Sequence, residues 1–454
     1  MAFDDALAAW LVRQRWFAGK GRGLRDLAVV ADTEVVGGDP ELRHLIITVS
    51  HGTTVDYYQV LVGLRRRLPA RLKHARIGPA GDGRQAYDAL HDSDLTKPLL
   101  AGIAADSTVG SLQMRKVAGA EFGTGLDSLV ISAEQSNTSL VFGDQSILKV
   151  FRRLSPGPNP DLEVTTALAR IGSPHVAEPL GWIETRLEGV STSLAILSRY
   201  MRLASDGWLL AATSVRDLYA SRDGAAAGGV RAADAGGDFA GEARRLGMAT
   251  AQVHADLAAA FGTDEVGADA AGELAERMFR NLDRARAAVP ELGRYAEMIG
   301  TAYATLTKLK GPFPIQRVHG DYHLGQVLRT ENGWVVLDFE GEPATPLAQR
   351  RARSSPLRDV AGMLRSFDYA ARHQLIGHPD QATLSGAAHD WVRRNTSAFC
   401  AGYAQAGGLD PDYPAANEVL LRALRLDKAV YEVLYEARHR PSWLPIPLES
   451  LAEF

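Results

Sequence analysis

Runs of apolar residues predict strands in the first part of the chain and helices in the rest. Before about residue 208 the runs are short, continuous or alternating with polar residues, and rich in β-branched and aromatic side chains. A short helix is expected around Ala6–Arg15. Gly143 and Asp144 separate two of the runs, which is typical of a hairpin. The expected strands are Leu45–Val49, Tyr57–Val62, Leu140–Phe142, Ile147–Phe151 and Ser193–Tyr200.

From about residue 208 the apolar positions follow helical spacing, interrupted by short strands at Gln316–His319 and Trp334–Phe339. A further helix is expected earlier, at Asp161–Arg170, with Asp161 as its N-cap. The Gly- and Ala-rich stretch Asp223–Gly237 is a low-complexity loop to which we assign no function. This order of elements predicts an α+β, bilobal fold with a β-rich N-lobe and a helical C-lobe.

The pattern divides the chain into three expected parts. Residues 1–105 form an N-terminal unit of their own, residues 106–203 form a β-rich N-lobe, and residues 204–454 form a helical C-lobe. The chain has 454 residues, of which 46% are hydrophobic and 23% charged, and this composition supplies ample material for buried cores.

Charge and cysteine content narrow the class of function and the compartment. The net charge of -4 argues against a general nucleic-acid binder. Cys400 is the single cysteine, so a disulfide framework is excluded and a cysteine-based zinc site is not expected. The N-terminus lacks a signal-peptide pattern, and no apolar run reaches the length of a membrane span. We therefore expect a cytoplasmic protein without a nucleic-acid or membrane partner.

The strongest candidate chemistry lies in two acidic segments of the C-lobe, His319–Gln326 and Val335–Gly341. Each follows an apolar run, so Asp321 and Asp338 are expected at strand ends. Asp321 precedes Gln326 by five positions and Asp338 by seventeen. In protein kinases an Asp, an amide residue and a second Asp in this order serve as catalytic base and magnesium ligands. We therefore expect a protein-kinase-like fold, with Asp321 as the base and with Gln326 and Asp338 as the Mg²⁺ ligands.

Two other interpretations of these segments, ordinary turns and a zinc site, are less well supported than phosphoryl transfer. Gly-Asp pairs are common in turns, so either segment alone carries little weight, whereas both at this spacing favour phosphoryl transfer. His319 and His323 lie four residues apart, but no further ligand cluster accompanies them to form a zinc site. We interpret His319 as structural support for the loop.

The nucleotide-binding elements are expected upstream, where Gln135–Ser139 lies between two predicted strands at the place of a phosphate-covering loop. The segment is not Gly-rich, so small polar side chains and backbone N–H groups would hold the phosphates of ATP. Lys149, among apolar neighbours, is expected to bind a phosphate and to pair with Glu163, because a buried Lys needs a partner. The alternative is an edge-strand Lys that reaches solvent. The candidate loop residues are Ser136, Asn137, Thr138 and Ser139.

The last long helix offers candidate ligands for an acceptor. Its apolar residues follow helical spacing, while Glu432 and Glu436, four positions apart, share one face that we expect to be exposed. A polyol is bound by carboxylates and Arg through hydrogen bonds and by an aromatic ring against its C–H face. A solvated, structural helix end remains the alternative for each residue. The candidate substrate ligands are Glu432, Tyr435, Glu436, Arg438 and Trp443.

These segments together resemble the maltokinases, relatives of the aminoglycoside phosphotransferases and choline kinases. The resemblance implies an N-terminal cap subdomain at residues 1–105, a β-rich intermediate part and a helical C-lobe. It also implies ATP and Mg²⁺ as cofactors, with Lys149 on a phosphate and with Glu436 and Arg438 on the sugar side. The similar segments cover nearly the whole chain and are His319–Gln326, Leu337–Pro343, Gln14–Lys20, Glu134–Ser139, Ser205–Trp208 and Tyr435–Leu448.

Maltokinases phosphorylate maltose at its anomeric hydroxyl to give maltose 1-phosphate for α-glucan synthesis. The resemblance therefore implies this activity and a functional link to glycan-synthesis enzymes. One departure is Tyr322, where the family has Leu in Gly-Asp-Leu-His. A Tyr beside the base, together with His323, is expected to line and reshape the acceptor pocket.

Three other functions remain open at this point. Some maltokinase-like proteins are glucosamine kinases that act on the 6-hydroxyl of the amino sugar, and an acidic cleft would suit its ammonium group. An aminoglycoside phosphotransferase is less favoured, because the mild net charge gives no sign of a broad acidic trough. A non-catalytic scaffold is also less favoured, since Asp321, Gln326, Asp338 and Lys149 are all present.

Overall fold

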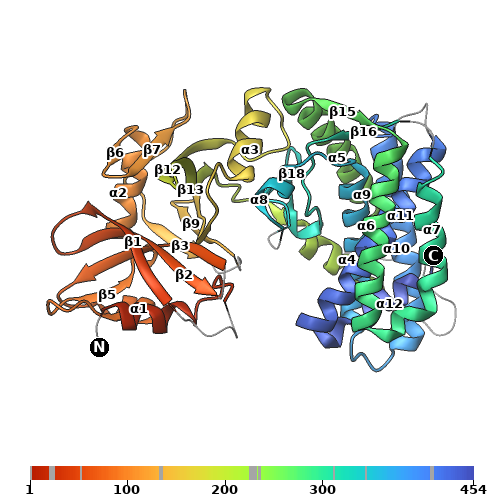
Figure 1. Ribbon diagram of the computed structural model, residues 1–454, viewed down its shortest axis with the longest axis horizontal. Coiled ribbons are helices and arrows are strands. Elements are labelled where there is room, and N and C mark those ends of the chain that lie inside the picture. The colour runs from red at the N-terminus through yellow and green to blue at the C-terminus, as the bar shows by residue number, and fades with distance from the viewer. Residues whose placement is uncertain are drawn as a thin grey trace. The chain divides into compact units, whose positions relative to one another are not determined.

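The computed structural model describes residues 3–19, 26–51, 54–131, 136–223, 233, 237–309, 312–342, 345–409 and 414–454. The chain forms two compact units, of which unit 1 comprises Met1–Ala169 and Ala177–Arg202. Unit 2 comprises Arg170–Val176 and Leu203–Phe454 (Figure 1). Most of the low-complexity stretch 223–237, and Glu134 and Gln135 of the predicted phosphate loop, lie outside the described residues. Within the described residues, no helix has both the length and the apolar character that a membrane span requires.

The N-terminal part of unit 1 is a helix packed on an antiparallel sheet of order β1-β2-β3-β5-β4. The predicted helix begins and ends earlier than expected, as α1 (Phe3–Leu11), whose Leu7, Trp10 and Leu11 are buried against the sheet. Strand β11 (Arg153–Leu154) returns from later in the chain to pair with β3. The other elements are β1 (Asp26–Val36), β2 (Glu41–His51), β3 (Thr54–Arg65), η1 (Ala70–Ala75), β4 (Arg76–Pro79), β5 (Gln85–Asp88) and η2 (Ala89–His91).

The rest of unit 1 is a seven-stranded antiparallel sheet of order β6-β7-β12-β13-β10-β9-β8. The predicted hairpin is confirmed as β9 and β10. Helix α3 is also confirmed, but Asp161 is not its N-cap, because the helix begins at Pro160 and the Asp161 N–H donates to Asn159 Oδ1 over 2.8 Å. The elements are α2 (Ser93–Ala104), β6 (Thr108–Val109), β7 (Leu112–Lys116), β8 (Ser128–Ile131), β9 (Thr138–Phe142), β10 (Ser146–Val150), α3 (Pro160–Arg170), β12 (Pro179–Leu187) and β13 (Val190–Arg199).

Unit 2 is mostly helical. Helices α5 and α10 pack so closely that a Cβ at Gly247 or Gly402 would collide with the facing backbone. The helices are α4 (Gly207–Asp223), α5 (Ala240–Phe261), α6 (Ala268–Ala288), η3 (Pro290–Tyr295), α7 (Ala296–Leu306), η4 (Leu324–Gln326), α8 (Leu347–Arg350), α9 (Leu357–Arg372), η5 (His373–Leu375), α10 (Gln381–Gln405), α11 (Pro414–His439), η6 (Pro441–Trp443) and α12 (Pro445–Leu451).

Short strands precede the acidic residues Asp321 and Asp338 of unit 2. The strand predicted at Gln316–His319 is observed earlier, as β16, and the strand predicted at Trp334–Phe339 is shorter, as β18. The α+β class with a β-rich first part and a helical second part is confirmed. The division at residues 105 and 203 stays a prediction. The strands are β14 (Ser205–Asp206), β15 (Thr263–Val266), β16 (Phe313–Gln316), β17 (Val327–Thr330) and β18 (Gly333–Val336).

A buried polar pair joins the two sheets of unit 1. Gln59 on β3 donates from Nε2 to the carbonyls of Phe151 and Leu194, over 2.7 and 2.6 Å. Its Oε1 therefore accepts from His44 Nε2, 2.9 Å away on β2. Burial lowers the pKa of His44 to about 4, so the ring is neutral at physiological pH.

We expect His44 to make unit 1 less stable in weak acid. The His44 ring has a pKa of about 6.5 in the unfolded chain and of about 4 in the folded chain, so between these pH values only the unfolded chain is protonated at His44. Stability is therefore full above about pH 6.5 and is lost as the pH falls toward 4, by about 2 kcal/mol between pH 7 and pH 5. Urea unfolding at both pH values checks this expectation against His44→Gln, which keeps a donor for Gln59. Equal pH dependence in the two proteins would contradict it.

Candidate active site

A buried histidine holds the loop that carries Asp321. Gly320 has a φ of +86°, a conformation that suits glycine. His319 Nε2 donates to the carbonyl of Leu337 over 2.8 Å, and the Asp321 N–H donates to His319 Nδ1 over 3.3 Å. The ring thus ties the loop of Asp321 to the segment of Asp338, and the interpretation of His319 as structural support is confirmed.

Asp359, on α9, binds the backbone of the same loop. Its carboxylate accepts from the N–H groups of His319 and Gly320, over 2.7 and 2.9 Å, and lies 3.2 Å from His254 Nε2. Burial alone would raise the pKa of Asp359, but the hydrogen bond and charge of His254 and the loop N–H groups hold it below its usual value. Sequence reasoning missed Asp359 because it lies in an ordinary amphipathic helix with no motif around it.

The two predicted magnesium ligands are neighbours at the β17–β18 hairpin. Gln326 Nε2 donates to Asp338 Oδ2 over 3.1 Å. Asp338 has a φ of +63°, which is rare for a residue with a side chain and is typical of functional positions. Carboxylate oxygens of Asp338 and Glu340 lie within 4.8 Å of each other. Glu340 was missed, although its place two residues after Asp338 is a usable signal for a further oxygen donor.

Helix α11 brings a cation and an aromatic ring beside the predicted base. Lys428 Nζ lies 3.8 Å from Asp321 Oδ1 and 4.9 Å from the centre of the Tyr431 ring. Burial, a hydrogen bond to Glu342 and the charge of Asp321 raise the pKa of Tyr431, so its hydroxyl stays protonated. Sequence reasoning did not assign Lys428 or Tyr431 to the site, because only the folded chain brings α11 to Asp321.

Three of the predicted substrate ligands keep exposed surface near the end of α11. Tyr435 is 40% exposed and stacks on Tyr431, with ring centres 6.1 Å apart. Trp443 is partly exposed, and the guanidinium of Arg440 lies 4.3 Å from its ring centre. Arg438 is exposed on the same helix. Their predicted contact with a sugar stays a prediction.

Glu432 and Glu436 are buried, so the prediction of an exposed acidic face is wrong. Glu432 is 8% exposed and accepts from Arg365 Nε over 2.8 Å. Glu436 is 1% exposed and accepts from Tyr369 Oη over 3.0 Å and from Arg440 Nε over 2.9 Å. These donors offset the repulsion that two neighbouring carboxylates would otherwise feel. Both carboxylates thus help to hold α11 in place, and their contact with a sugar stays a prediction.

Of the two residues after the base, Tyr322 faces inward and His323 keeps part of its surface exposed, and their place in the acceptor pocket stays a prediction. Tyr322 is buried, and its hydroxyl lies 2.8 Å from that of Thr250 on α5. Burial raises the pKa of Tyr322. His323 Nδ1 accepts from the Gly325 N–H over 3.1 Å and so caps η4. Burial lowers the pKa of His323, which favours the neutral ring that this contact needs.

In unit 1, Lys149 pairs with an acidic residue at the start of α3, and this residue is Asp161. Lys149 Nζ lies 3.0 Å from Asp161 Oδ2, two residues before the predicted Glu163. Ser139 lies opposite Lys149 in the β9–β10 register, so the two side chains share one face of the sheet. The roles of Glu163 and Ser139 at the nucleotide stay predictions.

The residues that end the predicted phosphate loop are unequally exposed. Ser136 is exposed, whereas Asn137, Thr138 and Ser139 are buried. Thr138 Oγ1 accepts from Arg152 Nε over 2.8 Å. Since the protein already engages this hydroxyl, we expect phosphate contacts here to come from Ser136 and from backbone N–H groups.

Two segments of the chain match known families. Residues 10–92 match the maltokinase N-terminal cap domain, and residues 224–419 match the phosphotransferase enzyme family. A glucosamine kinase of Streptacidiphilus jiangxiensis is 34% identical over 339 residues, which are 71% of this chain and 72% of that protein. A glucosamine kinase of Mycolicibacterium smegmatis is 29% identical over 330 residues, 71% of this chain and 78% of that protein.

The fold also matches solved structures along nearly its whole length. A glucosamine kinase in complex with glucosamine, ADP and inorganic phosphate has a TM-score of 0.68 and 26% identity, covering 99% of this chain and 98% of that chain. A second crystal form of glucosamine kinase has a TM-score of 0.69 at the same identity and coverage. The predicted kinase-like fold with an N-terminal cap is thereby confirmed.

Proposed function

The chain belongs to the family of phosphotransferases with a maltokinase-type cap that includes the glucosamine kinases, and on this premise we propose that its acceptor is glucosamine. It is an ATP-dependent kinase that acts on a hydroxyl of a sugar or amino sugar. The observation that carries the choice of glucosamine is the 34% identity to a glucosamine kinase over 71% of this chain. Maltose, which the sequence resemblance favours, stays an unconfirmed prediction.

In the proposed reaction the sugar hydroxyl attacks the γ-phosphorus, ADP leaves, and the hydroxyl proton passes to the Asp321 carboxylate. Lys428, 3.8 Å from that carboxylate, supplies positive charge where the transferred phosphoryl group develops negative charge. His319 and Asp359 keep the loop of Asp321 in place. In unit 1 we assign the phosphates of ATP to Lys149 and to the segment that begins at Ser136.

The oxygen donors of unit 2 fit a magnesium ion. Asp338, Glu340 and Gln326 lie together and offer hard ligands of the kind that Mg²⁺ takes in kinases. The Gln326 amide presents its nitrogen to Asp338 here, and a half-turn of the amide presents its oxygen instead. When bound, the ion would neutralise charge on the nucleotide phosphates.

An amino sugar differs from a neutral sugar by its ammonium group, which needs a carboxylate. We propose Glu342 for this contact, because its hydrogen-bond partner Tyr431 also interacts with Asp321. A charge-assisted hydrogen bond of this kind contributes about 1.5–3 kcal/mol, or about 10- to 150-fold in selectivity.

An ADP-release assay with Mg²⁺ and ATP tests the acceptor on glucosamine, glucose, N-acetylglucosamine, maltose and an aminoglycoside. We expect kcat/KM for glucosamine to exceed that for glucose by about 10- to 150-fold, and Glu342→Gln to remove most of this preference. The variant should lower kcat/KM for glucose less than twofold. Preference for maltose would overturn the proposed acceptor, and Mg²⁺-ATP binding without turnover on any acceptor would favour a scaffold.

A further inference from the structure

We propose that the segment Asp88–Thr96, which joins the end of the matched cap to the start of α2, sets the affinity for ATP by holding β8 and β9, the strands on either side of the predicted phosphate loop. This inference rests on the proposed nucleotide role of the segment that begins at Ser136. All the residues that carry it belong to unit 1, so the argument uses contacts within one compact body.

The first hold acts on β9 through a buried arginine. Arg152 follows β10 and is 1% exposed. Its Nε donates to Oγ1 of Thr138, the first residue of β9, over 2.8 Å, while its Nη2 donates to Asp88 Oδ2. Asp88 lies at the end of the cap strand β5. One guanidinium thus joins the cap directly to the residue at which the predicted loop ends.

Cap residues also fix Arg152 itself. Its guanidinium lies 5.0 Å from the ring centre of Trp16, which packs in the core of the cap sheet. Its backbone carbonyl accepts from the Gln59 N–H on β3 over 2.9 Å. A buried arginine that is stacked and paired on one side has little freedom to move, so it transmits the position of the cap to Thr138.

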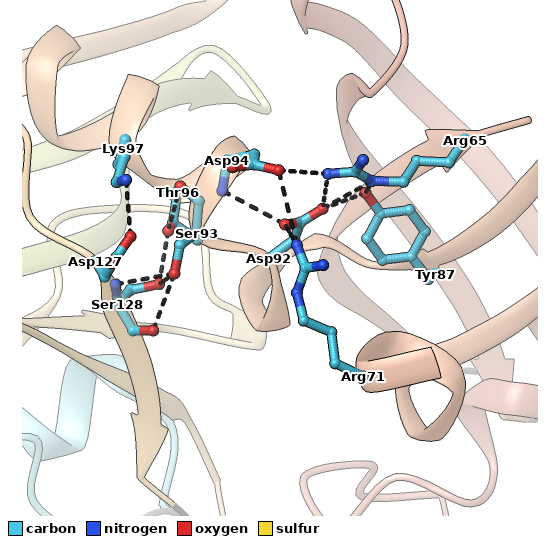
Figure 2. Close-up of polar contacts among 10 residues, drawn as sticks. All are labelled: Arg65, Arg71, Tyr87, Asp92, Ser93, Asp94, Thr96, Lys97, Asp127 and Ser128. Atoms are coloured by element: carbon cyan, nitrogen blue, oxygen red, sulfur yellow. Dashed lines mark hydrogen bonds and ion pairs between the residues drawn. The ribbon is translucent and has the colours of Figure 1, made fainter. Parts of the chain in front are cut away.

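The second hold acts on β8, which lies at the edge of its sheet and pairs with β9 alone among the named strands. Figure 2 shows Ser93 and Thr96, in the first turns of α2, facing Ser128 at the start of β8. The Ser128 N–H donates to Ser93 Oγ over 3.1 Å, and the hydroxyls of Ser128 and Thr96 lie 2.7 Å apart. Helix α2, which directly follows the matched cap residues 10–92, therefore anchors an edge strand that pairs with β9 alone among the named strands.

A buried carboxylate keeps this end of α2 in place. Asp92 is 0% exposed and caps the helix by accepting from the Asp94 N–H. Figure 2 shows it also meeting Tyr87 and Arg65, with Tyr87 Oη donating to Asp92 Oδ2 over 2.7 Å and Arg65 Nη2 doing so over 2.8 Å. The contacts of Asp92 with Tyr87 and Arg65 thus fix the end of α2 that carries the hydroxyls of Ser93 and Thr96.

These two holds act on both strands that flank the loop. Because β8 pairs with β9, both holds fix the start of β9, two residues after Ser136, and a ligand residue held in place before binding loses less conformational entropy. Loss of either hold should therefore weaken nucleotide binding while leaving the acceptor, which unit 2 binds in our proposal, unaffected. If these residues contributed only to packing, substituting them would lower the melting temperature without changing the affinity for ATP.

Calorimetric titration with Mg²⁺-ATP and steady-state kinetics on Thr96→Val and Asp88→Asn test the proposal. We expect Kd and KM for ATP to rise about 3- to 10-fold in Thr96→Val, because one hydrogen bond is lost. The rise should exceed tenfold in Asp88→Asn, where Arg152 loses its buried counter-charge, and Asp88→Glu should recover part of it. KM for glucosamine should change less than twofold in all three.

Two controls separate this role from general stability. Thr48→Val removes a hydroxyl that donates to the Ala28 carbonyl within the cap over 3.4 Å, far from β8 and β9 in sequence, and should leave ATP affinity unchanged. Val49→Ala opens the cap core and should lower the melting temperature without that change. Unchanged ATP affinity in both test variants would overturn the inference. Wild-type protein that binds ATP but phosphorylates no sugar would overturn the proposed function alone.

Discussion

Asp321→Asn is expected to lower kcat by about 10²- to 10⁴-fold, the usual contribution of a general base, with little change in affinity for Mg²⁺-ATP. Asn keeps the shape of the side chain but cannot accept the hydroxyl proton. The loop should keep its conformation, because His319 and Asp359 hold it through backbone N–H groups that the substitution does not touch. Rapid-quench and steady-state kinetics with glucosamine measure the loss, and calorimetry measures the nucleotide affinity.

Asp338→Ala is the matched comparison for that experiment. It removes the proposed principal metal ligand, so Mg²⁺-dependent ATP binding should weaken while ATP binding without the ion changes little. Opposite phenotypes in the two variants would separate a proton acceptor from a metal ligand. Asp321→Asn with near-wild-type kcat would remove Asp321 from the role of base, and unchanged magnesium dependence in Asp338→Ala would do the same for Asp338.

The parts of the fold that the sequence predicted are those with local signals. Hairpin β9–β10 shows an apolar run on each side of Gly143 and Asp144, and helix α3 shows helical spacing after a proline-rich stretch. Strand ends were less predictable. The segment Arg317–His319 was predicted to continue a strand, but β16 ends at Gln316, and the His319 N–H donates to the Asp359 side chain on α9.

The candidate site was predictable where its residues are close in sequence. Asp321, Gln326 and Asp338 lie in one loop-and-hairpin segment, so their spacing alone places them together. Asp359 and Lys428 reach the same place from α9 and α11, and only the packing of those helices brings them there. A single sequence holds no local record of such packing.

Burial of charge was the least predictable property. Glu432 and Glu436 look like an exposed acidic face, because the helical pattern shows which residues are neighbours but not what covers them. Arg365 and Tyr369, which bind Glu432 and Glu436, are distant in sequence on α9, whereas Arg440, the second partner of Glu436, is close in sequence. The second partner lies four residues after Glu436, a spacing that could have been used as a signal for an ion pair.

Arg365→Met is expected to lower the free energy of unfolding of unit 2 by about 3–5 kcal/mol, the typical cost of leaving buried carboxylates without their cation. Arg365 is 1% exposed and binds two acids, Glu432 over 2.8 Å and Asp368 over 2.9 Å, and it also donates to Ser450 on α12. Met fills similar volume, so the loss measures charge rather than a cavity. Urea unfolding followed by tryptophan fluorescence and far-ultraviolet circular dichroism measures it. Arg393→Met, which breaks an exposed pair with Asp390, should cost less than about 1 kcal/mol.

The double variant Arg365→Met, Glu432→Leu tests whether the Arg365–Glu432 pair neutralises a buried charge or holds α9 to α11. Asp368 keeps a second arginine, Arg372, whose Nε lies 3.7 Å away, so removing Glu432 leaves no buried acid without a cation nearby. If the cost of the single variant comes from the stranded charge of Glu432, the double variant should recover most of the lost stability and keep its KM for glucosamine within about twofold. A double variant as unstable as the single one would show that the ion pair holds α9 to α11 directly. A large rise in KM with restored stability would instead support a direct contact between Glu432 and the sugar.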